Sequence, residues 1–328
     1  MLTKLVAPSL ASVLVLVVGP LSASAQDWPT RPVTMVVPFA AGGTTDVLGR
    51  IMALRMGEIL AQPVAIENVG GAGGMTGSLR VARAEPDGYQ FLFSGLGAMV
   101  LSQALQKKPA FNAATDFAPV TLFAEVPLVL ITRKDLPVSN LQEFITYARA
   151  NQTKMNFGSA GVGSGPHIGC VLLNTAIRAH IAHVPYRGSG PAMQDLIAGR
   201  IDYYCDVLPT ALSQMESKTV KGIAILSRNR ATVVPDLPTA QEQGLTDFEV
   251  HTWFAFFLPR GTPDVIVSRL HRATVEATNT PSVRERLQGI GVTVVSPERM
   301  TPEYLGEFVR SETEKWANPI KALGLSTD

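Results

Sequence analysis

The sequence predicts an α/β protein made of two doubly wound domains joined by a hinge. Apolar runs of strand character alternate with segments of helical apolar spacing along the chain, a pattern typical of parallel sheets with right-handed crossovers. No low-complexity linker separates the two halves. We therefore expect a discontinuous first domain, residues 26–125 with 250–328, and a second domain, residues 126–249. A cleft should lie between them.

Three strands and two helices are predicted before Pro127. Val33–Val37 is a continuous apolar run, and in Thr44–Leu60 apolar residues recur at helical spacing. The pattern then repeats. The predicted strands are Val33–Val37, Val64–Ile66 and Tyr89–Phe93, and the predicted helices are Thr44–Leu60 and a segment near Gly77–Ala84.

A second series begins at Pro127. Ser139–Gln142 fits a capping box ahead of an amphipathic helix. The predicted strands are Pro127–Ile131, Met155–Phe157, Ile181–Val184, Ile201–Cys205 and Gly222–Leu226, and the predicted helices are Leu141–Ala148, one from Pro166, and Pro191–Ala198.

The last quarter of the chain should lead back to the first domain. Val250–Leu258 is a long apolar run that we interpret as a returning strand. Two helices should follow, because Thr262-Pro263-Asp264 and Thr301-Pro302-Glu303 each offer Thr as N-cap and Pro at the first helical position.

Composition limits the classes of function. The 328 residues are 46% hydrophobic and 17% charged, enough apolar material for two packed domains and unlike a disordered chain. The formal net charge is +1 and no cluster of Lys and Arg occurs. Nucleic-acid binding needs such a cluster to displace counterions, so we expect no nucleic-acid partner.

The first 25 residues have the pattern of a signal peptide. Lys4 gives a positive start, Leu10–Val18 is a short apolar run, and Ala23-Ser24-Ala25 supplies small residues for cleavage. The alternative is a membrane anchor, but the run is far shorter than the ~20 residues that span a bilayer. We expect cleavage after Ala25 and export of the remainder.

Three loops each follow a predicted strand and open a predicted helix: Pro38–Thr44, Gly70–Gly74 and Ser159–Gly165. Ligands of open α/β sheets bind outside the carboxyl ends of strands, and helix N-termini attract anions. None of the loops contains Lys or Arg, so an anion should be held by backbone amides. The alternative is that the glycines only make tight turns. The candidate ligand-binding residues are Phe39, Ala40, Gly42, Gly43, Thr44, Gly73, Gly74, Ser159, Gly163 and Ser164.

Motifs of common enzymes and cofactor sites are missing. Ser164 is not in G-x-S-x-G, no G-x-x-x-x-G-K-[ST] occurs, and Gly71-Ala72-Gly73 is followed by Thr76 where a dinucleotide fingerprint has its last glycine. The close pair His180 and His183 has no acidic partner beside it. We therefore expect neither an enzyme, a cofactor nor a metal site.

Several single residues have two interpretations each. Asp46 either caps its helix or contacts a ligand, and His167 either orients a loop or contacts a ligand. Arg187, in Tyr186-Arg187-Gly188-Ser189, is the best cationic candidate or a surface arginine. Asp206 ends a strand and so should point to the cleft edge. Trp253 belongs to the core or to the cleft wall.

The chain contains two cysteines, Cys170 and Cys205. An oxidising compartment would permit a bridge. One pair does not form a scaffold in a chain this long, so the sequence favours two buried free thiols.

Ordered motifs along the chain resemble the Bug-type receptors, which are the periplasmic solute-binding proteins of tripartite tricarboxylate transporters. The resemblance covers nearly all of the chain after residue 25. It rests on Trp28–Pro32, Val36–Asp46, Glu67-Asn68, Gly71–Gly74, Pro86–Tyr89, Asp116–Val120, Gly163-Ser164 with His167, His183–Ser189, Pro235–Thr239, Trp253, Pro259 with Gly261–Pro263, and Lys315-Trp316.

This resemblance implies a periplasmic Venus-flytrap receptor that closes on a small carboxylate without a cofactor. Phe39–Thr44 and Ser159–Ser164 would hold the carboxylate through backbone groups and water, and the segment around Asp206 would face the distal part of the ligand. A di-, tri- or aromatic carboxylate would fit. The implied partners are the membrane subunits of a transporter, and we expect a monomer. The alternative is a ligand-binding sensor that feeds a signalling partner.

Overall fold

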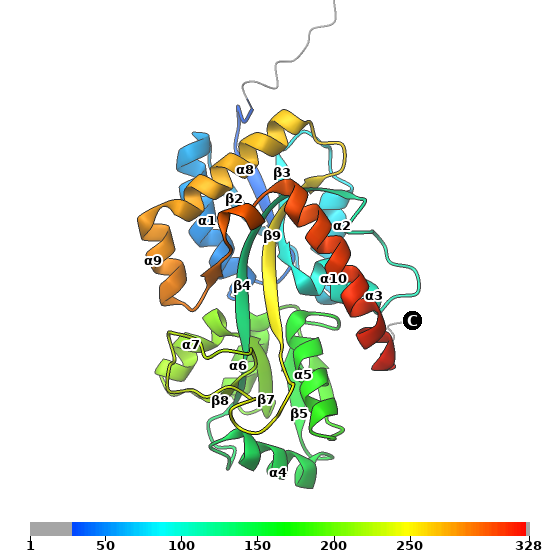
Figure 1. The fold of residues 1–328 in the computed structure, drawn as a ribbon, viewed down its shortest axis with the longest axis vertical. Coiled ribbons are helices and arrows are strands. Elements are labelled where there is room, and N and C mark those ends of the chain that lie inside the picture. The colour runs from blue at the N-terminus through cyan, green and yellow to red at the C-terminus, as the bar shows by residue number, and fades with distance from the viewer. Residues whose placement is uncertain (1–27, 326–328) are drawn as a thin grey trace, which may run out of the picture.

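The computed structural model describes residues 28–325, so the signal-peptide prediction lies outside the described residues. Two α/β lobes are stacked along the long axis and connected by strands β4 (Phe117–Arg133) and β9 (His251–Pro259). We refer to them as the first lobe, at the top of Figure 1, and the second lobe, below it. The two-lobed α/β architecture predicted from the sequence is confirmed.

The first lobe is built on a mixed sheet in the order β2-β1-β3-β9-β4, with β10 on the far side of β4. β1, β2 and β3 are parallel, as predicted, whereas β9 runs antiparallel to both of its neighbours. Its remaining strands are β1 (Val33–Val37), β2 (Val64–Asn68), β3 (Gln90–Gly95) and β10 (Thr293–Val294).

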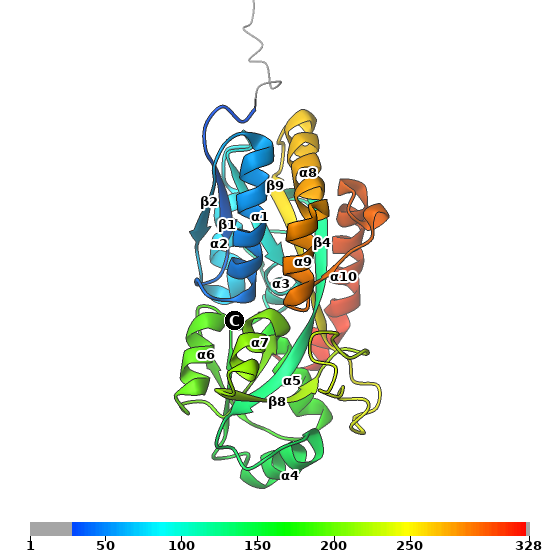
Figure 2. The same ribbon diagram turned by 90° about the vertical axis from the view of Figure 1, so that its left-hand side faces the viewer.

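Helices surround this sheet, and α1 lies beside α8 (Figure 2). They are α1 (Thr44–Leu60), η2 (Ala72–Gly74), α2 (Met75–Ala82), η3 (Gly97–Leu101), α3 (Ser102–Ala104), α8 (Asp264–Asn279), α9 (Pro281–Gly289), η4 (Pro297–Arg299) and α10 (Pro302–Ala322).

The second lobe continues the same hydrogen-bonded sheet. β5 is parallel to β6 and β7, while β4 pairs antiparallel with β7 and β8. The elements are α4 (Leu141–Asn151), β5 (Asn156–Ser159), α5 (Gly165–Ala176), β6 (Ala182–Pro185), α6 (Ser189–Ile197), β7 (Tyr203–Val207), α7 (Leu208–Glu216) and β8 (Val220–Ile225).

The strand predicted to begin at Pro127 is in fact the second half of β4, which runs unbroken through both lobes (Figure 2). Pro127 lies where β4 changes partners: Val126 and Pro127 face β9, and Leu128 begins the pairing with β7. A proline, which has no N–H to donate, is tolerated at such a change of ladder. The prediction of a new strand at Pro127 was wrong, because the strand that arrives from the first lobe does not end there.

Side-chain caps fix several helix starts. Asn140, not Ser139, caps α4: its side chain accepts from the Glu143 amide, and the Glu143 carboxylate accepts from the Ser139 amide. Thr301 caps α10 as predicted. The same prediction for Thr262 was wrong, because its hydroxyl donates to the carbonyl of Pro259 instead.

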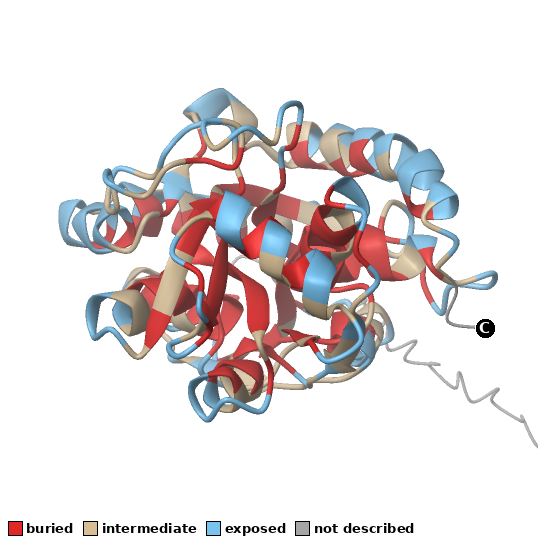
Figure 3. Cartoon of the chain, turned by 90° about the horizontal axis from the view of Figure 1, so that it is seen from below, coloured by how far each residue is buried: buried red, intermediate tan, exposed pale blue. Residues whose placement is uncertain are grey.

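The strands form the buried interior, and the exposed surface is carried largely by the outer faces of helices and by loops (Figure 3). Separate apolar clusters lie on the two faces of the sheet in each lobe.

In the second lobe, a disulfide joins Cys170 of α5 to Cys205 of β7, with 5.4 Å between the Cα atoms. The expectation of free thiols was therefore wrong. The crossover from β5 through α5 packs α5 against β7, and this brings residues 35 positions apart into bonding distance.

Candidate functional site

A small cavity of about 40 Å³ lies between the lobes. It is too small for a ligand of several carbon atoms, because the lobes are in contact around it. The first lobe lines it with Phe39, Gly43, Thr44, Thr45, Gly95, Gly97, Ala98, Thr252 and Phe254, and the second lobe with Ala160, Gly165, Pro166, Ser189 and Val207.

Helix N-termini converge on this cavity. Residues of the first turn or the N-cap of α1, α5, α6 and α7 line it, together with the start of the short helix η3. The first N–H groups of a helix have no partner within the helix and carry partial positive charge. None of the lining side chains is charged. The cavity therefore offers backbone donors and hydroxyls to an anion.

Asp46 holds the first loop in shape. Its carboxylate accepts hydrogen bonds from the Gly42 amide at 3.0 Å and the Asn68 side chain at 3.0 Å, and it pairs with Arg50 at 2.9 Å. Burial raises the pKa of Asp46, but the bonds from Arg50, Gly42 and Asn68 outweigh it, and the pKa lies below the usual range. Asp46 thus organises residues 42–46 and does not line the cavity.

Two histidines support the loop at residues 159–165. His167 Nδ1 accepts from the Gly163 amide at 3.2 Å, and His183 Nε2 is 2.6 Å from the Ser159 hydroxyl. The two rings lie 4.2 Å apart. Burial lowers the pKa of both, with a further contribution from His183 at His167, to about 3 for His167 and about 4 for His183. Neutral imidazoles therefore act as fixed hydrogen-bond partners behind this loop.

The two serines of the loop at residues 159–165 form hydrogen bonds with the backbone of that loop and of the helix that follows it. Ser159 accepts from the Gly161 amide at 3.0 Å, and Ser164 caps α5 by accepting from the His167 amide at 3.3 Å. The hypothesis that His167 orients a loop fits these contacts, whereas neither serine nor His167 lines the cavity.

The glycine-rich loop at residues 70–74 packs against Val162 of the second lobe and Phe39 of its own lobe. A Cβ atom at Gly73 would come within 2.1 Å of the Val162 carbonyl oxygen, and one at Gly74 within 2.8 Å of the Phe39 ring. Only glycine fits between these groups, and both residues also have positive φ. Gly73 lines an outer hollow of about 840 Å³, together with Val162, Tyr186 and Arg187.

Two polar contacts close the lobes directly. The Ala40 amide donates to the Arg187 carbonyl at 3.0 Å. The hydroxyls of Thr44 and Thr210 lie 2.5 Å apart. Ala40 therefore takes part in closure, although it does not line the cavity.

Asp206 lies at the end of β7, fully buried. Its Oδ1 accepts from the Ser189 hydroxyl at 3.0 Å and the Val207 amide at 2.8 Å, whereas Oδ2 has no hydrogen-bond partner among the described residues. Burial raises the pKa of Asp206 to about 7, although these bonds oppose the shift. Asp206 reaches the cavity through Ser189, which lines it.

Three expected contacts take other roles. Trp253 is buried in the core and donates to Glu312, so it is not a cleft wall. The Tyr186 hydroxyl donates to Asp195, and burial, with that hydrogen bond, raises the pKa of Tyr186 to about 12. Arg187 is exposed, its side chain has no ion pair within residues 28–325, and only its carbonyl bridges the lobes.

Sequence reasoning missed most of the second lobe's contribution. Ser189, Val207 and Thr210 come from starts of α6 and α7, and α7 itself was not predicted. Pro209 near the start of α7 was the available signal, since proline is favoured in a first helical turn. Gly97 and Thr252 belong to elements without a glycine-rich or polar motif, so no local signal marked them.

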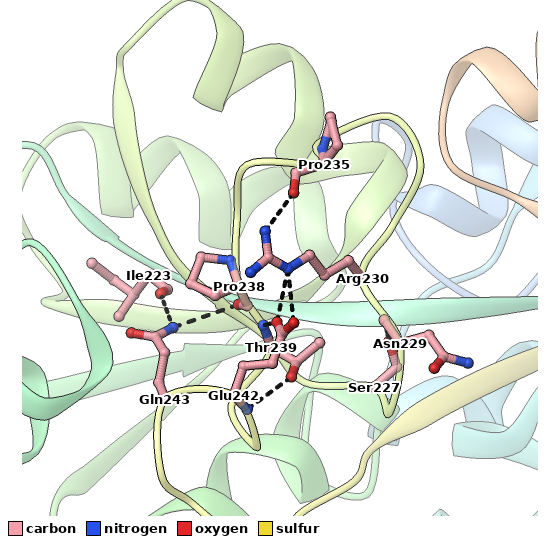
Figure 4. A network of polar contacts seen from close by, with 9 residues as sticks. All are labelled: Ile223, Ser227, Asn229, Arg230, Pro235, Pro238, Thr239, Glu242 and Gln243. Atoms are coloured by element: carbon pink, nitrogen blue, oxygen red, sulfur yellow. Dashed lines mark hydrogen bonds and ion pairs between the residues drawn. The ribbon is translucent and has the colours of Figure 1, made fainter.

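A larger hollow of about 630 Å³ lies beside the crossing strands, but helix N-termini do not line it. Its wall includes the segment that follows β8. There Arg230 pairs with Glu242 and donates to the Pro235 carbonyl, and Gln243 donates to the Ile223 carbonyl (Figure 4). These bonds hold a long irregular segment in place, and the hollow lacks the donor pattern of the interlobe cavity.

Within residues 28–325, no three side chains of His, Cys, Asp or Glu come together as metal ligands would. In the same part of the chain, no helix is long and apolar enough to cross a membrane.

The sequence matches the family described as "Tripartite tricarboxylate transporter family receptor" over residues 48–325. The chain belongs to this family. Two relatives are similar over most of their length. A protein of Agrobacterium vitis from the TAR-I ttuE-ttuC' intergenic region is 38% identical, covering 96% of this chain and 91% of its own. BugT of Bordetella pertussis is 34% identical, covering 92% of both chains.

Solved structures of similar receptors share the fold. MatC from Rhodopseudomonas palustris, solved with bound malate, is 40% identical with a TM-score of 0.86, covering 89% of this chain and all of its own. The periplasmic binding protein BugD is 37% identical with a TM-score of 0.87, covering 91% and 99%. R. palustris Rpa4515 with adipate is 33% identical with a TM-score of 0.86, covering 91% and 99%. The resemblance to Bug-type receptors is confirmed.

Proposed function

We propose that this receptor captures a small organic carboxylate in the periplasm and delivers it to the membrane subunits of a tripartite tricarboxylate transporter. One observation carries the proposal: helix N-termini from both lobes converge on a cavity without charged side chains. Such a site suits an anion. The malate and adipate bound by similar receptors support a carboxylate.

The ligand is recognised only when the two lobes close on it. The ligand enters when the lobes separate, and on closing it receives amides from both lobes, so neither lobe alone forms the site. Hydrogen bonds to a charged partner contribute roughly 1.5–3 kcal/mol each. Several of them suffice for micromolar affinity, about 8 kcal/mol. The corresponding domains are residues 26–125 with 250–328, and residues 126–249, and they move about β4 and β9.

The remaining parts of the proposal follow from this role. The protein acts as a monomer, carries out no catalysis, and reaches the periplasm by cleavage after Ala25. An intact-mass measurement on exported protein tests the cleavage: a chain starting at Gln26 is expected, and retention of Leu10–Val18 would refute it.

A thermal-shift screen across aliphatic and aromatic carboxylates tests the binding function. A ligand at 100 times its dissociation constant adds about 2.7 kcal/mol to the stability of the folded state. At least one carboxylate should raise the melting temperature. No shift with any carboxylate, alongside a shift with amines or sugars, would contradict the proposal.

Two variants test how the anion is held. Gly43→Val should abolish binding, since even a Cβ atom at Gly43 would lie 3.3 Å from Ser189 Cβ and the larger side chain would fill the cavity. Arg187→Ala should change the affinity for carboxylate less than about twofold, because the Arg187 side chain is exposed and does not line the cavity. The opposite pattern in titration calorimetry would favour an arginine–carboxylate pair.

A further inference from the structure

Ser189 connects the interlobe cavity to a buried polar pair. It is the first residue of α6 and lines the cavity. Its hydroxyl oxygen lies 3.0 Å from Asp206 Oδ1 and 2.8 Å from the Tyr204 hydroxyl. Asp206 and Tyr204 are both completely buried. The hydroxyl of Ser189 is therefore held by two partners, and neither partner can turn to water.

The order of donors and acceptors in this group follows from its chemistry. A carboxylate only accepts hydrogen bonds, so Ser189 gives its single hydrogen to Asp206. Tyr204 must then donate to the Ser189 oxygen. A hydroxyl oxygen has two lone pairs, and one of them is left over. Toward a ligand, Ser189 thus acts as an acceptor and cannot donate. The unpaired Oδ2 of Asp206 adds a second acceptor to the same group.

This arrangement differs from the rest of the cavity, where helix amides donate. A plain carboxylate has only acceptors to offer, and an acceptor placed against Ser189 would leave two facing acceptors unpaired. A ligand hydroxyl placed there would donate and satisfy the Ser189 oxygen. A buried polar group without a partner costs more free energy than a typical hydrogen bond contributes when it forms. The group therefore discriminates between ligands that differ by one hydroxyl.

We propose that Ser189, fixed by Asp206, is a specificity residue that makes the cleft prefer hydroxycarboxylates to carboxylates of equal length without the hydroxyl. This inference rests on the proposed function, because the amides must first hold the carboxylate. The ligand class is then a carboxylate that also carries a hydroxyl group. Malate and succinate differ by that hydroxyl alone and are the matched probes.

Titration calorimetry at pH 8, where Asp206 is ionised, tests the preference with malate, succinate and adipate. The unmodified protein should bind malate about tenfold more tightly than succinate, the factor expected of one hydrogen bond. In Ser189→Ala the ratio should fall to about one. If the alanine variant does not fold, Ser189→Cys serves instead, since a thiol is a weak acceptor.

A control separates this role from general damage to the cavity. Thr252→Val removes another lining hydroxyl, for which no hydrogen bond to an acid is found within residues 28–325. It should weaken malate and succinate by the same factor and keep their ratio.

Equal affinities for malate and succinate in the unmodified protein would overturn the inference. So would a malate preference that survives in the Ser189 variants. Binding of adipate without binding of malate or succinate would overturn the inference but leave the proposed function standing. No binding of any carboxylate would overturn both.

Discussion

The Ala40 amide and the Arg187 carbonyl oxygen form a hydrogen bond of 3.0 Å across the interlobe boundary. The bond joins the loop after β1 to the segment after β6, beside the cavity. Arg187 therefore contributes its backbone to closure, while its side chain remains exposed. Recognition and closure both depend on close approach of backbone to backbone, and glycines at this boundary make that approach possible.

Gly70→Ala should hinder closure. A Cβ atom at Gly70 would lie 2.7 Å from the Arg187 carbonyl oxygen and 3.0 Å from the Ala40 amide. These are backbone atoms and cannot turn aside, so the lobes must stay further apart. We expect at least a tenfold loss of carboxylate affinity, and small-angle scattering should give a larger radius of gyration at saturating ligand.

Gly289→Ala is the matched control for that variant. Nothing lies within 4 Å of a Cβ atom at Gly289, at the end of α9. Its affinity and radius of gyration should equal those of the unmodified protein. Equal behaviour of Gly70→Ala and Gly289→Ala would show that the boundary tolerates a methyl group and would contradict this account of closure.

Asp46→Ala should lower both stability and affinity. The substitution leaves the Gly42 amide without its acceptor and the Asn68 side-chain nitrogen with only its bond to the Phe39 carbonyl, at a cost of roughly 1–3 kcal/mol in the free energy of unfolding. Urea denaturation measures this. Asp135→Ala removes an acid whose pairing with Arg133 is exposed and should cost less than about 1 kcal/mol. Similar losses in both variants would contradict the special role of Asp46.

Asp206→Asn should become more stable than the unmodified protein as pH rises. The pKa of Asp206 is raised from 3.8 to about 7 in the folded protein, so the unfolded chain releases this proton first. The unmodified protein therefore loses stability between pH 4 and 7, by at most about 1.4 kcal/mol per pH unit. Asparagine does not titrate and avoids this loss. Urea denaturation at pH 4.5 and 7 should show a difference between the proteins that grows with pH. A constant difference would mean that the carboxyl has an ordinary pKa.

Removing the disulfide should destabilise the second lobe. Replacing Cys170 and Cys205 by alanine frees a loop of 35 residues in the unfolded chain, which costs roughly 3–4 kcal/mol. Dithiothreitol should lower the stability of the unmodified protein by a similar amount. It should not affect the double variant, because the chain has only two cysteines. Insensitivity of the unmodified protein to reductant would contradict the bridge.

Much of the fold could be predicted because its signals are local. Strand and helix alternation follows from apolar spacing, and β1, α1 and β9 match their predicted positions to within a residue or two. The loops at residues 38–44 and 159–165 were recognised because glycines and hydroxyl residues follow an apolar strand. Phe39, Gly43 and Thr44 do line the cavity. The resemblance to the receptor family also needed only the order of motifs along the chain.

Tertiary structure decided which residues meet. Thr44 and Thr210 are 166 positions apart, and no periodicity links them. The bond of Ser189 to Asp206 and the bridge between Cys170 and Cys205 likewise depend on how crossovers place helices over the sheet. Pro127 was misread because a local signal for a strand start cannot reveal that the strand changes partners there. Apolar spacing determines which segments form strands and helices, whereas long-range packing sets which side chains and amides share the cavity.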